Sequence, residues 1–367
     1  MDLANLIIQL FIVPERALQL DEAQWVPVIR ILRHQQLLAR YAERLRVNQL
    51  FEQLPDYAKH HMLNTEVLAN KQCHQVLFEA DELVRLLAPL NVEPVFLKGA
   101  AYSLGYRLSV GKGRTYSDID ILVPKEAITA VEQRLSLHGY FSEPMSDYDQ
   151  RYYRRWTHEI PPVRHHSRGT VLDIHHNLVP PVSGRAPEMH FFDSHLQVSA
   201  EGHKMLSLAG LTLHSLIHLL FNEDFKNAFR DLTDLHLLFS QCTEQDWQQL
   251  VQLAQQTGFE FELFLASRYC ETLLHSPIPK SFRQQLDKVR PNKLRMRLLD
   301  AMFLRVLCPR HPVIDRWPHK MADWLVWLRG HWLKMPLPIL IWHLLAKSSK
   351  GLLVALLGKS YFEPERR

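Results

Sequence analysis

The stretch of sequence that decides the fold is Arg114-Thr115-Tyr116-Ser117-Asp118-Ile119-Asp120-Ile121-Leu122-Val123. Its apolar run from Ile119 onward predicts a short buried strand. On a strand, residues two apart lie on the same face, so Asp118 and Asp120 would project side by side while the neighbouring isoleucines enter the core. Two adjacent carboxylates repel each other unless a cation joins them, and Mg²⁺ prefers such oxygen ligands. The stretch therefore predicts a metal site on a strand.

Two further apolar runs predict strands before and after this one. They lie at 92–97 and 171–174, and helical spacing over 100–108 and 125–137 separates the three strands. The order strand, helix, strand, helix, strand implies a small mixed sheet with helices packed against it. The polar, aromatic and histidine-rich stretch 147–168 predicts an edge strand or a loop that returns the chain to the sheet.

Helical sequence surrounds this predicted sheet. The chain has 367 residues, of which 47% are hydrophobic, so it can bury a large core. We expect an α+β fold in which a small mixed β-sheet core has flanking helices and a helical C-terminal half. The expected parts are an N-terminal helical segment (1–90), an α/β core (91–200), a helical domain (201–310) and a basic, tryptophan-rich helical tail (311–367).

The cysteines and the first residues bear on the cellular compartment. The four cysteines lie far apart and form no CxxC pair, so the sequence suggests neither a disulfide framework nor a zinc ribbon. The apolar N-terminus carries Asp2 and no basic region, which argues against a secretory signal. A cytoplasmic location is expected.

Asp173 adds a third acid to the predicted sheet. It lies in the apolar run Leu172-Asp173-Ile174-His175, where an unpaired buried charge would be costly. Three acids that converge at one sheet edge suit two-metal phosphoryl or nucleotidyl transfer. Asp173 could instead cap a turn or pair with Arg164 or Arg168.

Basic residues and a glycine lie close to the predicted acids in sequence. Lys98 and Gly99 stand where the first strand leads into a helix, and glycine lets the backbone approach a phosphate closely. Lys98 adds a positive charge there. Arg107, Lys112 and Arg114, between that helix and the aspartate strand, are further candidates for binding phosphate.

These residues resemble a known family as an ordered set. The set consists of Leu97-Lys98-Gly99-Ala100, a following arginine, Ser117-Asp118-Ile119-Asp120-Ile121-Leu122-Val123 and Leu172-Asp173-Ile174-His175. Together they resemble the uncharacterised nucleotidyltransferase family of the DNA polymerase beta-like superfamily, over about residues 90–240. The resemblance implies that Asp118, Asp120 and Asp173 are catalytic residues and ligands of Mg²⁺ or Mn²⁺. It also implies that the Lys-Gly turn forms part of a cradle for a nucleoside triphosphate.

Histidines offer a weaker signal, because the chain has 21 of them. His214 and His218 lie four apart on a predicted helix, but the motif of a zinc protease is absent, and pairing with Arg230 or Asp234 is the favoured interpretation. Among the other histidines, His175 is the best candidate for the site, because on a strand it shares a face with Asp173.

The C-terminal tail differs in charge from the rest of the chain. From Arg290 onward there are 15 Lys and Arg residues against 5 Asp and Glu residues, and five of the eight tryptophans lie in this region. Three interpretations remain open: ordinary core helices, which we favour, then an amphipathic anchor on an anionic membrane surface, and last a nucleic-acid-binding face.

The sequence thus predicts a metal-dependent nucleotidyltransferase that moves a nucleoside monophosphate group from a nucleoside triphosphate to an unidentified acceptor. One alternative is a non-enzymatic adaptor that keeps the fold and docks through its basic tail on a membrane or an acidic partner. Another is a phosphoester hydrolase with the same metal site. If the tail binds anionic lipid, the protein would lie at the inner face of the membrane.

Overall fold

The computed structural model describes residues 2–105 and 109–342. Arg107 and the part of the tail after Trp342 therefore lie outside the described residues. The α-helices are α1 (Leu3–Ile12), α2 (Glu22–His34), α3 (Leu38–Val47), α4 (Asp56–Leu87), α5 (Lys98–Leu104), α6 (Ile128–Leu137), α7 (Asp147–Trp156), α8 (Leu208–Phe221), α9 (Ala228–Gln241), α10 (Glu244–Thr257), α11 (Glu260–Leu274), α12 (Lys280–Leu286), α13 (Lys293–Val306) and α14 (Trp317–Lys334). The strands are β1 (Val95–Leu97), β2 (Ile119–Leu122), β3 (Tyr140–Ser142), β4 (Val163–His165), β5 (Val171–His175), β6 (Leu196–Val198) and β7 (Lys204–Leu206).

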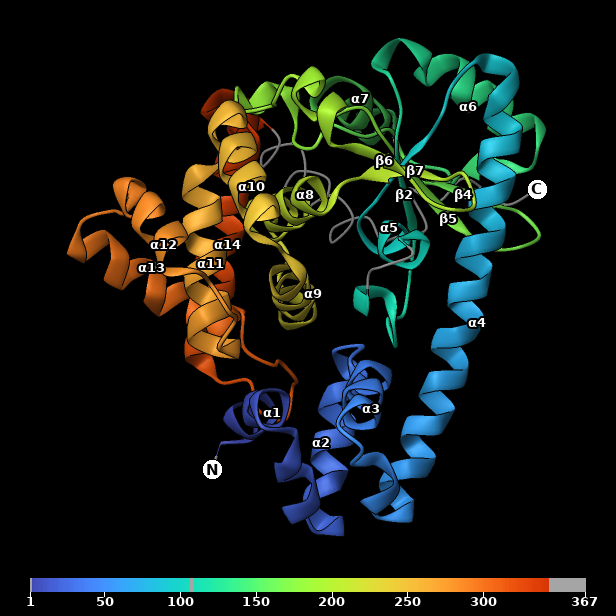
Figure 1. Ribbon diagram of the computed structural model, residues 1–367. Helices are drawn as coiled ribbons and strands as arrows, with labels where there is room; N and C mark the ends of the chain where they lie inside the picture. Colours follow the sequence, from blue (N-terminus) through green and yellow to red (C-terminus); the bar gives the residue numbers. More distant parts are fainter. Residues whose placement is uncertain (1, 106–108, 343–367) are drawn as a thin grey trace, which may run out of the picture.

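The strands form one mixed sheet in the order β3-β4-β5-β2-β1-β7-β6. The central strand β2 pairs with β5 in parallel and with β1 in antiparallel fashion. Helices surround this sheet and make up most of the remaining chain (Figure 1). The predicted α+β class, with a small mixed sheet and a helical C-terminal half, is confirmed.

The register of the three central strands, β5, β2 and β1, brings the predicted site residues close together. Asp120 lies opposite Leu97, the residue before Lys98, on one side and opposite Asp173 on the other. All four residues of β2 are buried, as its apolar sequence predicts. The chemistry-bearing residues therefore come from three adjacent strands that the chain reaches through helical connections.

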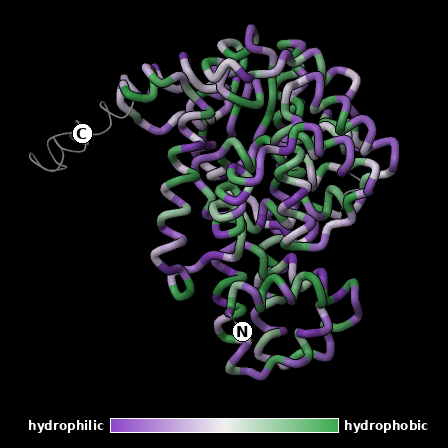
Figure 2. The backbone as a smooth tube through the Cα atoms, turned by 90° about the vertical axis from the view of Figure 1, so that its left-hand side faces the viewer, coloured by the Kyte–Doolittle hydropathy of each residue, from purple (hydrophilic) through white to green (hydrophobic). Residues whose placement is uncertain are grey.

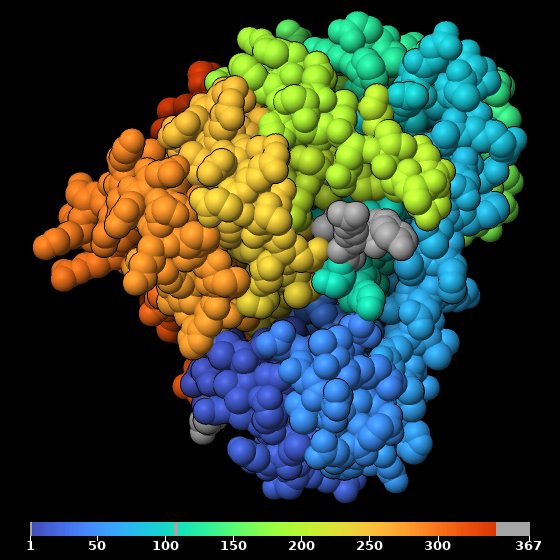
Figure 3. Space-filling model, viewed as in Figure 1, coloured from blue at the N-terminus to red at the C-terminus, as the bar shows by residue number. Residues whose placement is uncertain are grey.

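The long helix α4 links the N-terminal helices to the sheet. It spans 32 residues, and its last turns reach the sheet (Figure 1). Helices α2 and α3 pack against it, whereas α1 contacts α2 and α11. The N-terminal helices form a lobe below the rest of the molecule (Figure 2), and the space-filling view shows the two parts in close contact (Figure 3). Buried apolar residues of both parts belong to one continuous core.

One predicted segment differs from the structure. The stretch 147–168 begins with the helix α7 rather than with a loop, and only its end forms a strand, β4, which lies between β3 and β5 and not at the edge. The helix forms because Ser146 accepts a hydrogen bond from the amide of Asp149 as its N-cap, while acidic side chains occupy its first turn and arginines its last. These capping signals act together with an aromatic stripe of Tyr148, Tyr152 and Trp156, which lie four residues apart.

The helical half packs around α8, of which nearly every residue is buried. Helix α14 contacts α8 and α13, and its Gly330 lies against the backbone of Asn222 and Glu223, where a β-carbon would come within 2.8 Å of the Asn222 carbonyl oxygen. Within residues 2–105 and 109–342, no helix combines the length and the hydrophobicity needed to cross a membrane.

Candidate functional site

Asp120, on the central strand β2, lies at the centre of a cluster of polar side chains that includes Lys98 and His175. Its side chain is buried, and its Oδ1 accepts hydrogen bonds from Lys98 Nζ at 2.6 Å and from His175 Nε2 at 2.9 Å. Burial alone would raise the pKa of this carboxyl, but the Lys98 ammonium and the His175 ring hold it well below its usual range. Asp120 is therefore an ionised carboxylate at neutral pH.

The pKa values of Asp118 and Asp173 are shifted upward, in the opposite direction from that of Asp120. Burial and the neighbouring Asp120 raise the pKa of Asp118, and burial together with Asp120 and Glu159 raises that of Asp173 to about 8. The Oδ1 atom of Asp173 is buried and has no hydrogen-bond partner. A carboxylate oxygen left in this way among other acids fits a site built for a divalent cation.

The alternative roles for Asp173 are not realised, because both arginines pair elsewhere. Arg168 Nε donates to Glu79 Oε1 at 2.6 Å, and Arg164 lies 3.3 Å from Glu143. Asp173 instead faces Asp120 across the β2–β5 pair.

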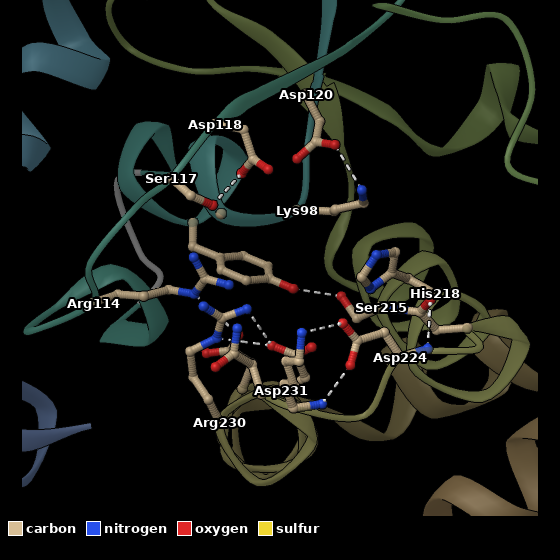
Figure 4. Close-up of a pocket in the computed structure, with 16 residues that line it drawn as sticks. Lys98, Arg114, Ser117, Asp118, Asp120, Ser215, His218, Asp224, Arg230 and Asp231 are labelled. Atoms are coloured by element: carbon tan, nitrogen blue, oxygen red, sulfur yellow. Dashed lines mark hydrogen bonds and ion pairs between the residues drawn. The ribbon is translucent and has the colours of Figure 1, made fainter. Parts of the chain in front are cut away.

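A pocket of about 240 Å³ lies beside the acids. Figure 4 shows Asp118, Asp120 and Lys98 on one side of it and Arg114 and Arg230 on the other. Further lining residues come from the end of α8 and from α9. The pocket thus joins a cluster of acids to a wall that presents the guanidinium groups of Arg114 and Arg230, each paired with an aspartate, and guanidinium groups suit phosphate oxygens.

The Lys98-Gly99 turn is tightly constrained. Lys98 has a φ of +43°, a left-handed conformation that is unfavourable for a residue with a β-carbon. A β-carbon on Gly99 would lie 2.5 Å from Nη1 of Arg114 and 3.0 Å from the ring of Tyr116. Glycine is therefore required so that the guanidinium of Arg114 can lie against the start of α5.

Arg114 reaches the pocket wall as part of a buried ion-pair network. Its Nε donates to Oδ2 of Asp234 at 3.0 Å, and Nη1 of Arg40 donates to the other carboxylate oxygen. Asp234 lies on α9, so this network fixes the helical half against the loop that precedes β2. Arg114 lines the pocket while Asp234 holds its orientation.

A second pocket, of about 260 Å³, shares Lys98 and Asp118 with the first. It adds Asp173, Glu159 and Glu223. Sequence reasoning missed Glu159, because only the fold places it beside the sheet, and it missed the partnership of Asp234 with two arginines. No spacing signal connects these residues, which lie 39 or more positions from Asp120 in sequence.

The sequence favoured a pairing of His214 and His218 with Arg230 or Asp234. In the structure both of these possible partners bind other residues. Asp234 binds Arg40 and Arg114, and Arg230 binds Asp231. His214 is buried, which lowers its pKa to about 3, whereas His218 lines both pockets. His175 does reach the site, through its hydrogen bond to Asp120.

The fold, a small mixed sheet with a helical part, is consistent with a nucleotidyltransferase core. The chain matches the model of the uncharacterised nucleotidyltransferase family over residues 21–275 and belongs to that family. A search of curated proteins gave no match. Family membership supports a nucleotidyltransferase-type function in general and leaves the substrates open.

Proposed function

We propose that this protein is a metal-dependent nucleotidyltransferase whose catalytic residues are Asp118, Asp120 and Asp173. The observation that carries the proposal is that Asp120 and Asp173 lie opposite each other on the adjacent central strands β2 and β5. The Oδ1 atom of Asp173 also has no hydrogen-bond partner. Mg²⁺ or Mn²⁺, held by these three carboxylates, would supply the Lewis acid that polarises the α-phosphate.

The proposed reaction breaks the phosphoanhydride bond between the α- and β-phosphates and forms a new bond from the α-phosphorus to the acceptor oxygen. An acceptor oxygen attacks the α-phosphorus of a nucleoside triphosphate, the bond from that phosphorus to the bridging oxygen breaks, and pyrophosphate leaves with the electron pair. The acceptor's proton passes to a carboxylate of the site or to solvent. Asp173 would take this proton only where it does not ligate the second ion, because its Oδ1 has no hydrogen-bond partner.

The basic residues would bind and orient the triphosphate. Lys98 donates a hydrogen bond to Asp120 and lines both pockets. Arg114 lies in the wall of the first pocket, against Gly99. Arg114 offers planar, directed donors that suit phosphate oxygens. Asp234 would preorganise this arginine, so that little rotamer entropy is lost on nucleotide binding.

Transfer of label tests the proposal. The full-length protein is incubated with each α-³²P-labelled nucleoside triphosphate and Mg²⁺ or Mn²⁺, together with a cell extract divided into small molecules, RNA and protein. We expect label in one fraction, and we expect Asp118→Asn to reduce transfer by at least about 10²-fold. The midpoint temperature of thermal unfolding of Asp118→Asn should not fall below that of the wild type, because the variant removes a negative charge that Asp120 repels.

The matched control is Asp287→Asn, which removes a half-exposed aspartate in the helical half. It should transfer label as the wild type does. Equal transfer by Asp118→Asn and by the wild type would refute the assignment, and release of free nucleotide with no labelled acceptor would favour a phosphoester hydrolase instead.

A second candidate function is docking on an anionic membrane surface through α14. Six apolar residues at helical spacing are exposed along one face of this helix: Trp317, Met321, Trp324, Leu325, Leu328 and Trp332. The opposite face, with Ala322, Val326 and Gly330, packs against the protein. Because Lys and Arg predominate from residue 290 onward, charge complementarity favours an anionic bilayer surface as the partner of this aromatic face.

A further inference from the structure

A short extended segment crosses the end of β5, next to the catalytic acids. The amide of Ile160 donates to the carbonyl of Ile174 at 3.1 Å, and the amide of His176 donates to the carbonyl of His158 at 2.8 Å. Between these two bonds, Glu159 pairs with His175 as an isolated bridge. The backbone pairing therefore fixes His158 and Glu159 beside His175.

These three side chains bring their donor atoms together. One ligand atom of each of His158, Glu159 and His175 lies within 4.8 Å of the other two. The ring of His175 is 1% exposed, and its Nδ1 is buried without a hydrogen-bond partner. The Nδ1 of His158 is also buried and unpartnered. Two buried imidazole nitrogens left without partners beside a carboxylate call for an explanation.

The hydrogen bond between His175 and Asp120 determines which nitrogen can bind a ligand. Because a carboxylate only accepts hydrogen bonds, Nε2 of His175 is the donor to Asp120, and Nδ1 is the ring nitrogen left for a ligand. Nδ1 lies 3.5 Å from Oε2 of Glu159. That separation is long for a hydrogen bond, but it is close to the roughly 3.4 Å between two ligands of a tetrahedral ion at about 2.05 Å.

We propose that His158, Glu159 and His175 form a transition-metal site that binds Zn²⁺. Two imidazole nitrogens and one carboxylate oxygen are a ligand set that Zn²⁺ favours, whereas Mg²⁺ takes oxygen ligands alone. The site is thus distinct in chemistry from the all-oxygen cluster of Asp118, Asp120 and Asp173. Asp120 serves it as the carboxylate that orients a ligating histidine from behind, the usual arrangement around protein-bound zinc.

The position of this site gives the ion access to the reaction centre. His158 and Glu159 line the same pocket as Asp173. Three protein ligands leave a fourth position that a water molecule or an oxygen of the acceptor can occupy from that pocket. The ion also adds positive charge where carboxylates gather. His175 joins the two sites, with Nε2 on Asp120 and Nδ1 on the ion.

Metal binding to the full-length protein tests the proposal without any activity assay, so that its outcome does not depend on nucleotidyl transfer. The chelator-treated protein is titrated with Zn²⁺ in excess Mg²⁺, and separately with Co²⁺, whose visible absorption reports a site of low coordination number. Because the chain has 21 histidines, the tightest site is the quantity measured. We expect one equivalent of tight Zn²⁺ that Mg²⁺ does not displace.

Variants assign the site to its ligands. His158→Gln and Glu159→Gln should each weaken the tightest site by more than about 100-fold, since even outer partners of metal ligands contribute 10- to 100-fold. His166→Gln is the matched control on an exposed histidine in the turn after β4, and Asp118→Asn disables the proposed nucleotide site alone. Both should bind Zn²⁺ as the wild type does. Absence of a tight site, or unchanged binding by folded His158→Gln and Glu159→Gln proteins, would overturn the proposal.

Discussion

Asp234 shows how one residue couples distant parts of the chain. Its two carboxylate oxygens accept hydrogen bonds from Arg40 of α3 and Arg114 of the loop before β2, and its side chain is 4% exposed. The two arginines hold its pKa below the usual range although burial acts in the opposite direction. Removal of the charge would leave two buried guanidinium groups without a counterion.

We therefore predict that Asp234→Asn lowers the free energy of unfolding by about 3–5 kcal/mol, the usual cost of breaking a buried ion pair. Urea denaturation measures this change. Asp287→Asn, a surface control whose partner lies 3.8 Å away, should change stability by less than about 0.5 kcal/mol. If Asp234→Asn unfolds at the same urea concentration as the control, the network does not hold the helical half against the sheet.

At the scale of elements, α4 is anchored to the sheet by a buried glutamate. Glu79 is 0% exposed and accepts hydrogen bonds from Arg168, Thr170 and Tyr140, which lie on or beside β3, β4 and β5. Burial opposes its ionisation, but Arg168 and the two hydroxyl groups hold the pKa of Glu79 below its ordinary value of 4.5. The stability that results is present above that value and is lost as the pH falls below it.

Glu79→Gln should accordingly be less stable than the wild type by about 2–4 kcal/mol at neutral pH, and the difference should narrow below pH 4.5. Urea denaturation over a pH series measures this. Glu82→Gln, one turn further along α4, removes a surface pair with Arg85 and should have little effect at any pH. A stability difference that stays constant across the pH series would contradict the assigned ionisation.

The elements differ in how far the sequence could predict them. Runs of apolar residues predicted β1, β2 and β5 within a residue or a few, because buried strands need continuous apolar sequence. Helix α7 was missed because its stripe of Tyr148, Tyr152 and Trp156 is aromatic and lies within an otherwise strongly polar sequence. The three-residue strands β3, β6 and β7 were not predicted, because they do not lie in continuous apolar runs like the one that contains β1.

The site could be predicted only in part for a related reason. The order of Lys98, Asp118, Asp120 and Asp173 along the chain is a recognisable pattern, because each lies within a buried strand or next to one. Glu159 and Asp234 lie in segments whose local sequence indicates no chemistry, and they reach the site through pairing with β5 and packing of α9. Tertiary contacts of this kind have no signature in a single sequence.

At the scale of the whole molecule, α14 connects its exposed aromatic face to the candidate site. Lys334, at the end of the helix, pairs with Glu223 and lines the pocket that contains Asp173, and Arg329 donates to the carbonyl of Leu220 at 2.6 Å. The described part of the tail is therefore a packed helix with one free face. The buried side of α14, with Ala322, Val326 and Gly330, packs as an ordinary core helix does. The exposed apolar side is the surface proposed to dock on a membrane.

We predict that replacing Trp317, Trp324 and Trp332 together with serine abolishes sedimentation with anionic vesicles while the fold is retained. These side chains are 57–71% exposed, so their loss costs few internal contacts. At about 1 kcal/mol for each partly buried side chain, vesicle binding should weaken about 100-fold. Added salt should weaken wild-type binding further, because the lipid charge is screened.

Vesicle sedimentation of a matched triple variant separates a specific face from general hydrophobicity. Val47, Val67 and Leu137 are 70–79% exposed and lie outside the tail, so their replacement with serine removes comparable apolar surface. This control should sediment with anionic vesicles as the wild type does. Equal sedimentation of both triple variants, or equal binding of the wild type to neutral and anionic vesicles, would exclude α14 as an anionic-membrane contact. Binding that depends on both the tryptophans and the lipid charge would instead place the pocket-lining end of α14 next to the bilayer, and acceptors attached to lipid would then be the first to test.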